Sequence, residues 1–170
     1  MRPLRLALSA NKINSISIFQ SQTGKFWALI VAIVIGGGLD QWLKYSLGFL
    51  RQTGEIYWGP VGLTWYENPG IAFSLPLPVP WAIGLVVALL LFLVGLLWQS
   101  RRTGWAYSVG LILVISGGVS NLIDKIVLGF VRDFVSIGWL PVFNLADMLI
   151  LVGIILVILG VGRGEQHQKI

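Results

Sequence analysis

Four long apolar stretches limit the folds that this chain can adopt. They cover residues 26–47, 79–98, 104–125 and 143–162, and each holds close to the roughly 20 residues that an α-helix needs to cross a bilayer. Of the whole chain 56% is hydrophobic and only 11% is charged, whereas about 25% of a typical soluble domain is charged. We therefore predict an all-α integral membrane protein with four transmembrane helices.

The segments outside these stretches differ in character. Residues 48–78 mix aromatic and β-branched residues with glycine and proline, which predicts short strands and turns. We expect them to form a small β-rich cradle between the first and second helices. Residues 99–103 are a short connection and residues 126–142 a longer loop. Residues 1–25, which are basic and lack acids, and residues 163–170 are predicted as polar tails.

The distribution of positive charge predicts the orientation in the membrane. The N-terminal tail holds four of the twelve lysine and arginine residues, the 99–103 connection two and the C-terminal tail two. Because cytoplasmic segments carry the excess of lysine and arginine, we predict both termini in the cytoplasm and residues 48–78 and 126–142 outside it. The net charge of +5 then reflects topology rather than nucleic-acid binding.

Four aspartates on separate segments converge on the outer face under this topology. At about 1.5 Å per residue, Asp40 lies about 21 Å along the first helix and Asp147 about 6 Å into the fourth. Asp124 ends the third helix, and Asp133 belongs to the 126–142 loop. An ionised carboxylate inside a helix bundle costs at least ~2.5–3.5 kcal/mol on insertion scales, so such residues are functional candidates.

A purely structural role is the alternative for two of these acids. Asp40 precedes Lys44 by four residues, the spacing at which an ion pair forms on one helix face. Asp124 has Lys125 and Asn121 as candidate partners. Structural pairing is a weaker explanation for the remaining two aspartates, because neither has a basic residue at helical pairing distance.

The pattern Asn-x-x-Asp occurs twice, as Asn121–Asp124 and as Asn144–Asp147. At this spacing the amide and the carboxylate share a helix face, so the asparagines can orient the acids or hold substrate backbone. Two facing carboxylates share one proton, and one can activate water while the other hydrogen-bonds a carbonyl oxygen.

The chain has no cysteine, and its one histidine, His167, lies in the tail, which argues against a zinc site or a Ser-His-Asp triad.

These motifs resemble those of the bacterial lipoprotein signal peptidases, or signal peptidase II. The blocks that carry the resemblance are LDQWLKY at 39–45, ENPGIAFSL at 67–75, GGVSNLIDKIVLGFVRDFVSIG at 117–138 and PVFNLADMLILVG at 141–153. The resemblance implies an aspartic endopeptidase of the bacterial plasma membrane, with its site near the extracytoplasmic face. It would remove the signal peptide from diacylglyceryl-modified prolipoproteins by cleaving just before the lipidated cysteine.

The resemblance also assigns residues and partners. It implies Asp133 and Asp147 as the catalytic pair. Its substrate-binding or supporting positions fall on Asp40, Lys44, Asn68, Gly70, Asn121, Asp124, Lys125, Asn144 and Ala146. It implies prolipoprotein and membrane lipids as partners, with no metal or organic cofactor. We expect a monomer that does not bind nucleic acid. The 48–78 cradle would hold the substrate, and the loop at 126–142 would act as a flap over it.

Two positions depart from the family pattern. Lys125 stands where the family usually has arginine, so the charge is kept but the planar fork for a bidentate contact to substrate carbonyls is lost. Arg132 stands where an apolar residue is usual. A neighbouring cation favours the ionised form of an acid, so we predict that Asp133 is charged at rest and that Asp147 holds the shared proton. Arg132→Val is then expected to move the acidic limb of the pH–rate profile to higher pH.

Two other functions are compatible with parts of the pattern. A Ser-Lys membrane signal peptidase would use Ser74 or Ser120 as nucleophile and Lys44 or Lys125 as base. A small proton-coupled transporter would use the intramembrane acids as a relay. Such transporters usually show internal repeats and helices broken at the midplane, whereas the repeat here is only the short Asn-x-x-Asp pair.

Overall fold

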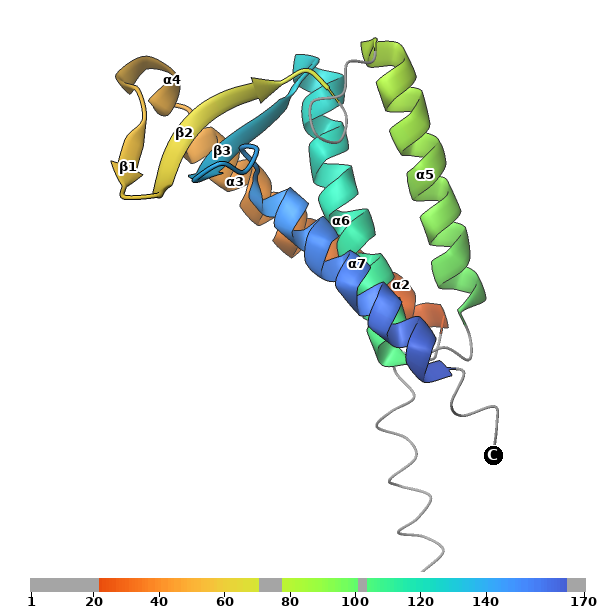
Figure 1. The fold of residues 1–170 in the computed structure, drawn as a ribbon. Coiled ribbons are helices and arrows are strands. Elements are labelled where there is room, and N and C mark those ends of the chain that lie inside the picture. The colour runs from red at the N-terminus through yellow and green to blue at the C-terminus, as the bar shows by residue number, and fades with distance from the viewer. Residues whose placement is uncertain (1–21, 71–77, 101–103, 165–170) are drawn as a thin grey trace, which may run out of the picture.

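The computed structural model describes residues 22–70, 78–100 and 104–164, and Figure 1 shows their arrangement. Most of both predicted tails and most of the 99–103 connection lie outside these residues. Within the described part, three helices are long and apolar enough to cross a membrane. They are Gln22–Thr53, Val79–Gln99 and Trp105–Leu128. A fourth helix, Leu145–Gly164, contains the apolar run Leu145–Val161.

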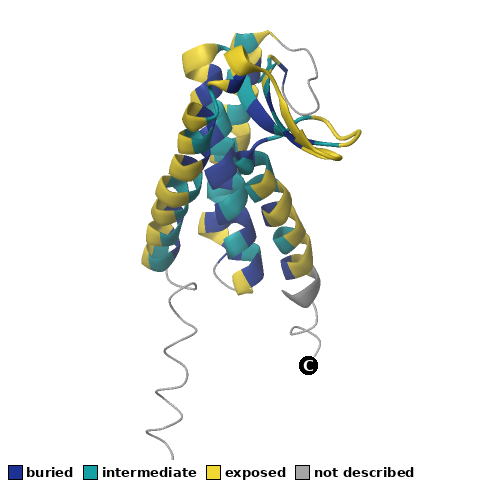
Figure 2. Ribbon diagram, turned by 90° about the vertical axis from the view of Figure 1, so that its left-hand side faces the viewer, coloured by how far each residue is buried: buried dark blue, intermediate teal, exposed yellow. Residues whose placement is uncertain are grey.

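The helical elements in chain order are α2 (Gln22–Ala32), η1 (Ile33–Gly37), α3 (Gly38–Ser46), α4 (Leu50–Thr53), α5 (Val79–Gln99), α6 (Trp105–Leu128) and α7 (Leu145–Gly164). Buried residues concentrate on α6, while the outer faces of the surrounding helices are exposed (Figure 2). Those outer faces are apolar, with Phe92, Leu151 and Ile158 each more than half exposed. Exposed apolar surface of this extent is expected when lipid rather than water surrounds a helix bundle.

A three-stranded antiparallel sheet projects from one end of the bundle (Figure 1). Its strands are β1 (Ile56–Trp58), β2 (Val61–Asn68) and β3 (Val131–Ile137), in that order. Sequence pattern predicts strands only in residues 48–78 and a loop or flap at residues 126–142. Instead, that loop supplies β3, which is paired along β2. Local pattern did not predict β3, because strand formation depends on a partner distant in sequence.

The first transmembrane helix begins earlier than predicted. Gln22 to Lys25 form the first turn of α2 rather than the end of a tail. The Lys25 ammonium is buried and donates to the backbone oxygen of Ser100, the residue that ends α5, and to its hydroxyl at 2.9 Å. A cation at a helix C-terminus is favourable because it meets the unpaired carbonyls, and here it joins α2 to α5.

The π-helix η1 sets the orientation of α3. It widens the helix at the glycine run 36–38, and a π-turn of this kind changes the face on which the following residues lie. The Ser116 hydroxyl on α6 donates to the Ala32 oxygen at 2.6 Å, at the N-terminal edge of η1. A Cβ added to Gly36 would lie 3.0 Å from Leu149 and 3.2 Å from Ser116. Helices α6 and α7 therefore approach the first helix closely at Gly36.

Helices α6 and α7 pack backbone against backbone through glycines. A Cβ added to Gly110 would lie 2.6 Å from the Gly153 oxygen, and one added to Gly153 would lie 2.6 Å from the Gly110 oxygen. One added to Gly117 would lie 2.4 Å from the Ala146 oxygen. Small residues allow such close approach in membrane helices. This contact brings the start of α7, which carries Asp147, against the middle of α6.

Gly153→Ala is expected to lower the free energy of unfolding by about 2 kcal/mol, because overpacking against backbone costs about 1–3 kcal/mol. The matched control is Gly84→Ala in α5, where an added Cβ meets nothing within 4 Å. That control should be neutral or slightly stabilising, since alanine favours helix over glycine. Unfolding of both variants in detergent micelles measures the difference, and equal stability would contradict the close α6–α7 contact.

Candidate active site

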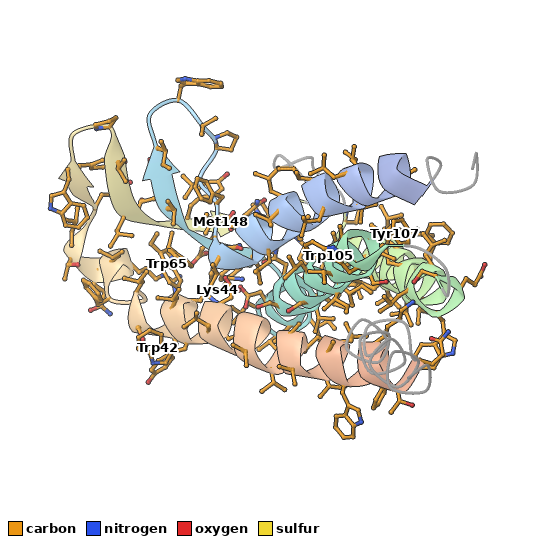
Figure 3. All side chains as sticks on the ribbon, turned by 90° about the horizontal axis from the view of Figure 1, so that it is seen from below. Trp42, Lys44, Trp65, Trp105, Tyr107 and Met148 are labelled. Atoms are coloured by element: carbon orange, nitrogen blue, oxygen red, sulfur yellow. The ribbon has the colours of Figure 1, made fainter. Side chains whose placement is uncertain are left out.

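Polar side chains gather where the sheet joins the bundle. They come from α3, α6, β2, β3 and the first turn of α7, elements that are far apart in the sequence but adjacent here (Figure 1). Figure 3 shows Lys44 in the space between α3 and the start of α7. The predicted convergence of Asp40, Asp124, Asp133 and Asp147 on one end of the bundle is therefore confirmed.

The second Asn-x-x-Asp motif begins helix α7. Asn144 accepts a hydrogen bond from the Asp147 backbone N–H through its Oδ1 at 2.9 Å, and its own N–H donates to Asp147 Oδ2 at 3.1 Å. This reciprocal arrangement resembles a capping box, which satisfies N–H groups left unpaired at a helix start. Asn121 Nδ2 on α6 donates to the other oxygen, Oδ1, at 2.8 Å. The Asp147 carboxylate is therefore oriented from two helices.

Asp133 is buried on β3 and is held by two amides. Asn144 Nδ2 donates to its Oδ1 at 2.6 Å, and Asn68 Nδ2 from β2 donates to its Oδ2 at 3.1 Å. The same Asn144 side chain thus contacts Asp133 and the backbone N–H of Asp147, and it links the two acids. Ala146 is fully buried beside them.

Burial raises the pKa of Asp133 to about 7, and the charge of Asp147 raises it as well. The hydrogen bonds from Asn68 and Asn144 act in the opposite direction and do not cancel the increase. Burial therefore favours the protonated form of Asp133, which is opposite to the direction expected from a neighbouring cation.

The premise that Arg132 acts on Asp133 as a neighbouring cation is wrong, because the Arg132 side chain does not face Asp133. Its guanidinium donates to both oxygens of Asp124, at 3.2 Å from Nε to Oδ2 and at 2.7 Å from Nη2 to Oδ1. Nη2 also donates to Gln41 Oε1 at 2.7 Å. Successive side chains of a strand point to opposite faces, so the cation and its neighbouring acid lie on different sides of β3.

Lys44 stands at the centre of a buried charge cluster and is itself fully buried. Its Nζ lies 2.7 Å from Asp40, 3.3 Å from Asp124 and 3.0 Å from Asn121 Oδ1. The predicted pairing of Asp40 with Lys44 is confirmed. Asp40 also accepts the Ala146 backbone N–H at 3.0 Å, and so binds the N-terminus of α7.

The partners predicted for Asp124 were wrong. Neither Lys125 nor Asn121 contacts it among the described interactions, and it binds Arg132, Lys44 and Gln41 instead. Gln41 was not predicted as a site residue. Its position next to Asp40 in the LDQWLKY block is the one sequence signal that points to it.

Lys125 binds the chain's own backbone. Its Nζ donates to the oxygens of Pro69 at 2.6 Å, Gly70 at 2.5 Å and Asn68 at 3.5 Å. Asn68 Oδ1 in turn accepts the Gly70 N–H at 3.0 Å. Lysine therefore shapes the turn that follows β2, the turn that positions the Asn68 amide against Asp133.

A groove of about 410 Å³ opens beside the two acids between α5 and α6. Asp133, Asp147, Asn121 and Lys125 line one end of it. The remaining wall is apolar and is formed mainly by leucine and valine side chains: Leu85, Val86, Leu89, Leu90 and Leu93 of α5 with Val114 and Leu122 of α6. An extended apolar ligand could therefore lie along the groove with a polar group at the acids.

Residues 29–162 match the family described as Signal peptidase (SPase) II. The chain belongs to this family. Signal peptidase II is a family of aspartic peptidases, so the chain is an aspartic peptidase.

Curated relatives and solved structures agree with the family match. The lipoprotein signal peptidase of Lactiplantibacillus plantarum is 33% identical over 146 residues, which are 83% of this chain and 96% of the relative. That of Clostridioides difficile is 38% identical over 135 residues, 75% and 88% of the two chains. A bacterial membrane enzyme solved by the in meso method at 2.3 Å has the same fold, with a TM-score of 0.70 at 23% identity over 82% of this chain and 90% of that one.

Membership of signal peptidase II decides against the two alternative functions. In the Ser-Lys alternative, Ser120 would have to donate its proton to a lysine. Its hydroxyl donates instead to Asp40 Oδ2 at 2.7 Å, and Lys44 is bound to carboxylates. Ser74, the other candidate nucleophile, lies outside the described residues. The intramembrane acids are likewise tied into one site at the sheet rather than spaced along a path across the bilayer.

Proposed function

We propose that this signal peptidase II removes signal peptides from diacylglyceryl-modified prolipoproteins, with Asp133 and Asp147 as its catalytic pair. The observation that carries the proposal is their shared setting: both line the polar end of one apolar groove, and Asn144 links them. The groove would take the apolar part of the substrate, and the scissile bond just before the lipidated cysteine would lie at the acids.

Cleavage would follow the general chemistry of a paired-carboxylate peptidase. The ionised acid of the pair takes a proton from a water molecule, whose oxygen attacks the scissile carbonyl carbon. The protonated acid donates a hydrogen bond to the carbonyl oxygen and stabilises the tetrahedral intermediate. A proton then passes to the departing amide nitrogen as the C–N bond breaks. Asn68, Asn121 and Asn144 hold both carboxyl groups in place throughout.

The site is proposed to lie near the extracytoplasmic face, with both termini in the cytoplasm. The excess of lysine and arginine in the tails and in the 99–103 connection supports this orientation. The exposed apolar outer faces of the helices, with Phe92, Leu151 and Ile158 each more than half exposed, support contact with membrane lipid.

Substrate selectivity tests the proposed function. Purified protein in detergent or lipid is incubated with a prolipoprotein peptide that carries a diacylglyceryl group on its cysteine, and with the same peptide unmodified. We expect cleavage of the modified peptide at the bond before the cysteine, read by mass spectrometry, and little cleavage of the other. Equal cleavage of both peptides, or a cut elsewhere, would refute the proposed substrate.

The pH dependence of this reaction is expected to reflect Asp133. Since burial and the charge of Asp147 raise the pKa of Asp133 to about 7, Asp133 loses its proton as the pH rises through that value. The pair then carries two negative charges and has no acid left for the carbonyl oxygen, so kcat/KM should fall on the alkaline side. A profile of kcat/KM across the neutral range measures this, and a kcat/KM that keeps rising as the pH passes the Asp133 pKa of about 7 would contradict it.

A further inference from the structure

Arg132 is placed to control the strand that carries Asp133. It is the second residue of β3, and its side chain is only 16% exposed. Its backbone N–H donates to Asp124 Oδ2 at 3.0 Å, in addition to the two guanidinium contacts with the same carboxylate. One carboxylate of α6 therefore binds both the backbone and the side chain of the residue before Asp133.

The same guanidinium reaches a third element. Through Gln41 Oε1 it is joined to α3, and Gln41 Nε2 donates to Asp124 Oδ1 at 2.8 Å and to the Ser120 oxygen at 3.0 Å. Arg132, Asp124 and Gln41 thus form a closed set of hydrogen bonds between β3, α6 and α3. A planar guanidinium suits this arrangement because its donors are held in a rigid fork.

We propose that Arg132 is a positioning residue for Asp133, acting through Asp124: it fastens the start of β3 to α6 and α3 and balances the negative charge of Asp124 behind the site. The proposal rests on the proposed function of the acid pair. It adds a residue whose side chain binds Asp124 and Gln41 rather than Asp133, and which is not among the residues that line the groove.

Charge balance gives the proposal its testable consequence. Asp40 and Asp124 lie opposite Lys44 and Arg132 in the cluster behind the pair. The cluster is neutral as long as both cations are present. Removing the charge of Arg132 leaves one negative charge in excess in the cluster, whose Lys44 also acts on Asp133. An excess negative charge disfavours ionisation of a carboxyl group.

The other groups that act on Asp133 do not depend on the Arg132 side chain for their contacts with it. They are Asp147 from α7, Lys44 from α3 and Lys125 from α6, together with the amides of Asn68 and Asn144. None of these contacts Arg132 through a charged group. A change in the titration of Asp133 in a variant at position 132 therefore reports the pairing with Asp124.

Four variants test the proposal: Arg132→Gln, Arg132→Lys, Asp124→Asn and the double variant Arg132→Gln/Asp124→Asn. Misplacing a catalytic group by about 1 Å costs about 100-fold, so Arg132→Gln should lower kcat by about that factor. It should also move the titration of Asp133 to higher pH by about one unit. Arg132→Lys keeps the charge but loses the fork, so kcat should fall while the titration stays.

The double variant separates charge from simple disruption. It has the same net charge in the cluster as the native chain, so the titration of Asp133 should return to its native pH even if kcat stays low. The titration is followed in the full-length protein in lipid by infrared spectroscopy of the protonated carboxyl band, assigned by its loss in Asp133→Asn. This readout does not need turnover, so a failure of the proposed substrate and a failure of this inference remain distinguishable.

The inference would be overturned by a native titration in Arg132→Gln, or by a shift that persists unchanged in the double variant. Either result would mean that Arg132 contributes only to folding. A kcat of Arg132→Gln equal to that of the native chain, measured on the diacylglyceryl-modified peptide, would also overturn it.

Discussion

Asp147→Asn is expected to abolish cleavage of the prolipoprotein peptide, and Asp133→Asn should do the same. Each change removes one carboxyl group of the pair, and the loss of an acid–base group lowers kcat by up to about 10⁴-fold. An amide cannot act as a base toward water, and it cannot act as an acid that transfers a proton to the carbonyl oxygen. The two variants should therefore be inactive at every pH, not merely shifted in their pH dependence.

Each asparagine is nearly isosteric with the acid it replaces, so folding should be retained. In Asp147→Asn the amide oxygen can still accept a hydrogen bond from Asn121 or from the Asn144 N–H, though not from both. A matched control is Glu67→Gln in β2, an acid paired with the exposed Arg51 away from the groove. The control should cleave at the native rate. Turnover by either aspartate variant would remove that residue from the catalytic pair.

Lys44→Met should produce the largest loss of stability. The change keeps the volume and removes the cation that lies within 3.3 Å of both Asp40 and Asp124. Breaking a buried ion pair from one side costs about 3–5 kcal/mol, because an uncompensated charge stays buried. The start of α7 should be displaced as well, since Asp40 binds the Ala146 N–H, and activity should fall with stability.

The double variant Asp40→Asn/Lys44→Met is the control. It removes the charges of both partners, and replacing a buried pair by neutral groups is often close to neutral for stability. Unfolding in detergent micelles, followed by helix content, compares the single and double variants. If Lys44→Met were as stable as the double variant, the cluster would not be an energetically coupled ion pair.

Composition and the length of the apolar stretches were sufficient to predict the long helices. The predicted span at residues 79–98 differs by one residue from α5, Val79–Gln99, and the span at 104–125 extends to Leu128 in α6. Helices of this kind can be predicted because their apolar length is determined by the thickness of the bilayer and not by neighbouring segments. The start of α2 at Gln22 was missed because Lys25, a charged residue, is buried by a contact with α5.

Pairwise contacts across the fold could not be predicted in the same way. Arg132 and Asp133 are neighbours in the chain, which suggested an electrostatic interaction between them, yet β3 places their side chains on opposite faces. Asn144 was expected to share a helix face with Asp147. It lies instead immediately before the first residue of α7, Leu145, and its amide donates to Asp133 on β3.

The sequence by itself determined that this is a membrane protein whose acids meet at one end of the bundle, since each acid's depth follows from its position along a span. The motif blocks pointed to the signal peptidase II family, to which the chain belongs. The spacing also predicted the Asp40–Lys44 pair. Only the tertiary structure decided that Arg132 pairs with Asp124 and that amides, rather than Arg132, contact Asp133. Depth in a bilayer is a property of one helix, whereas the partner of a buried charge depends on how several elements pack together.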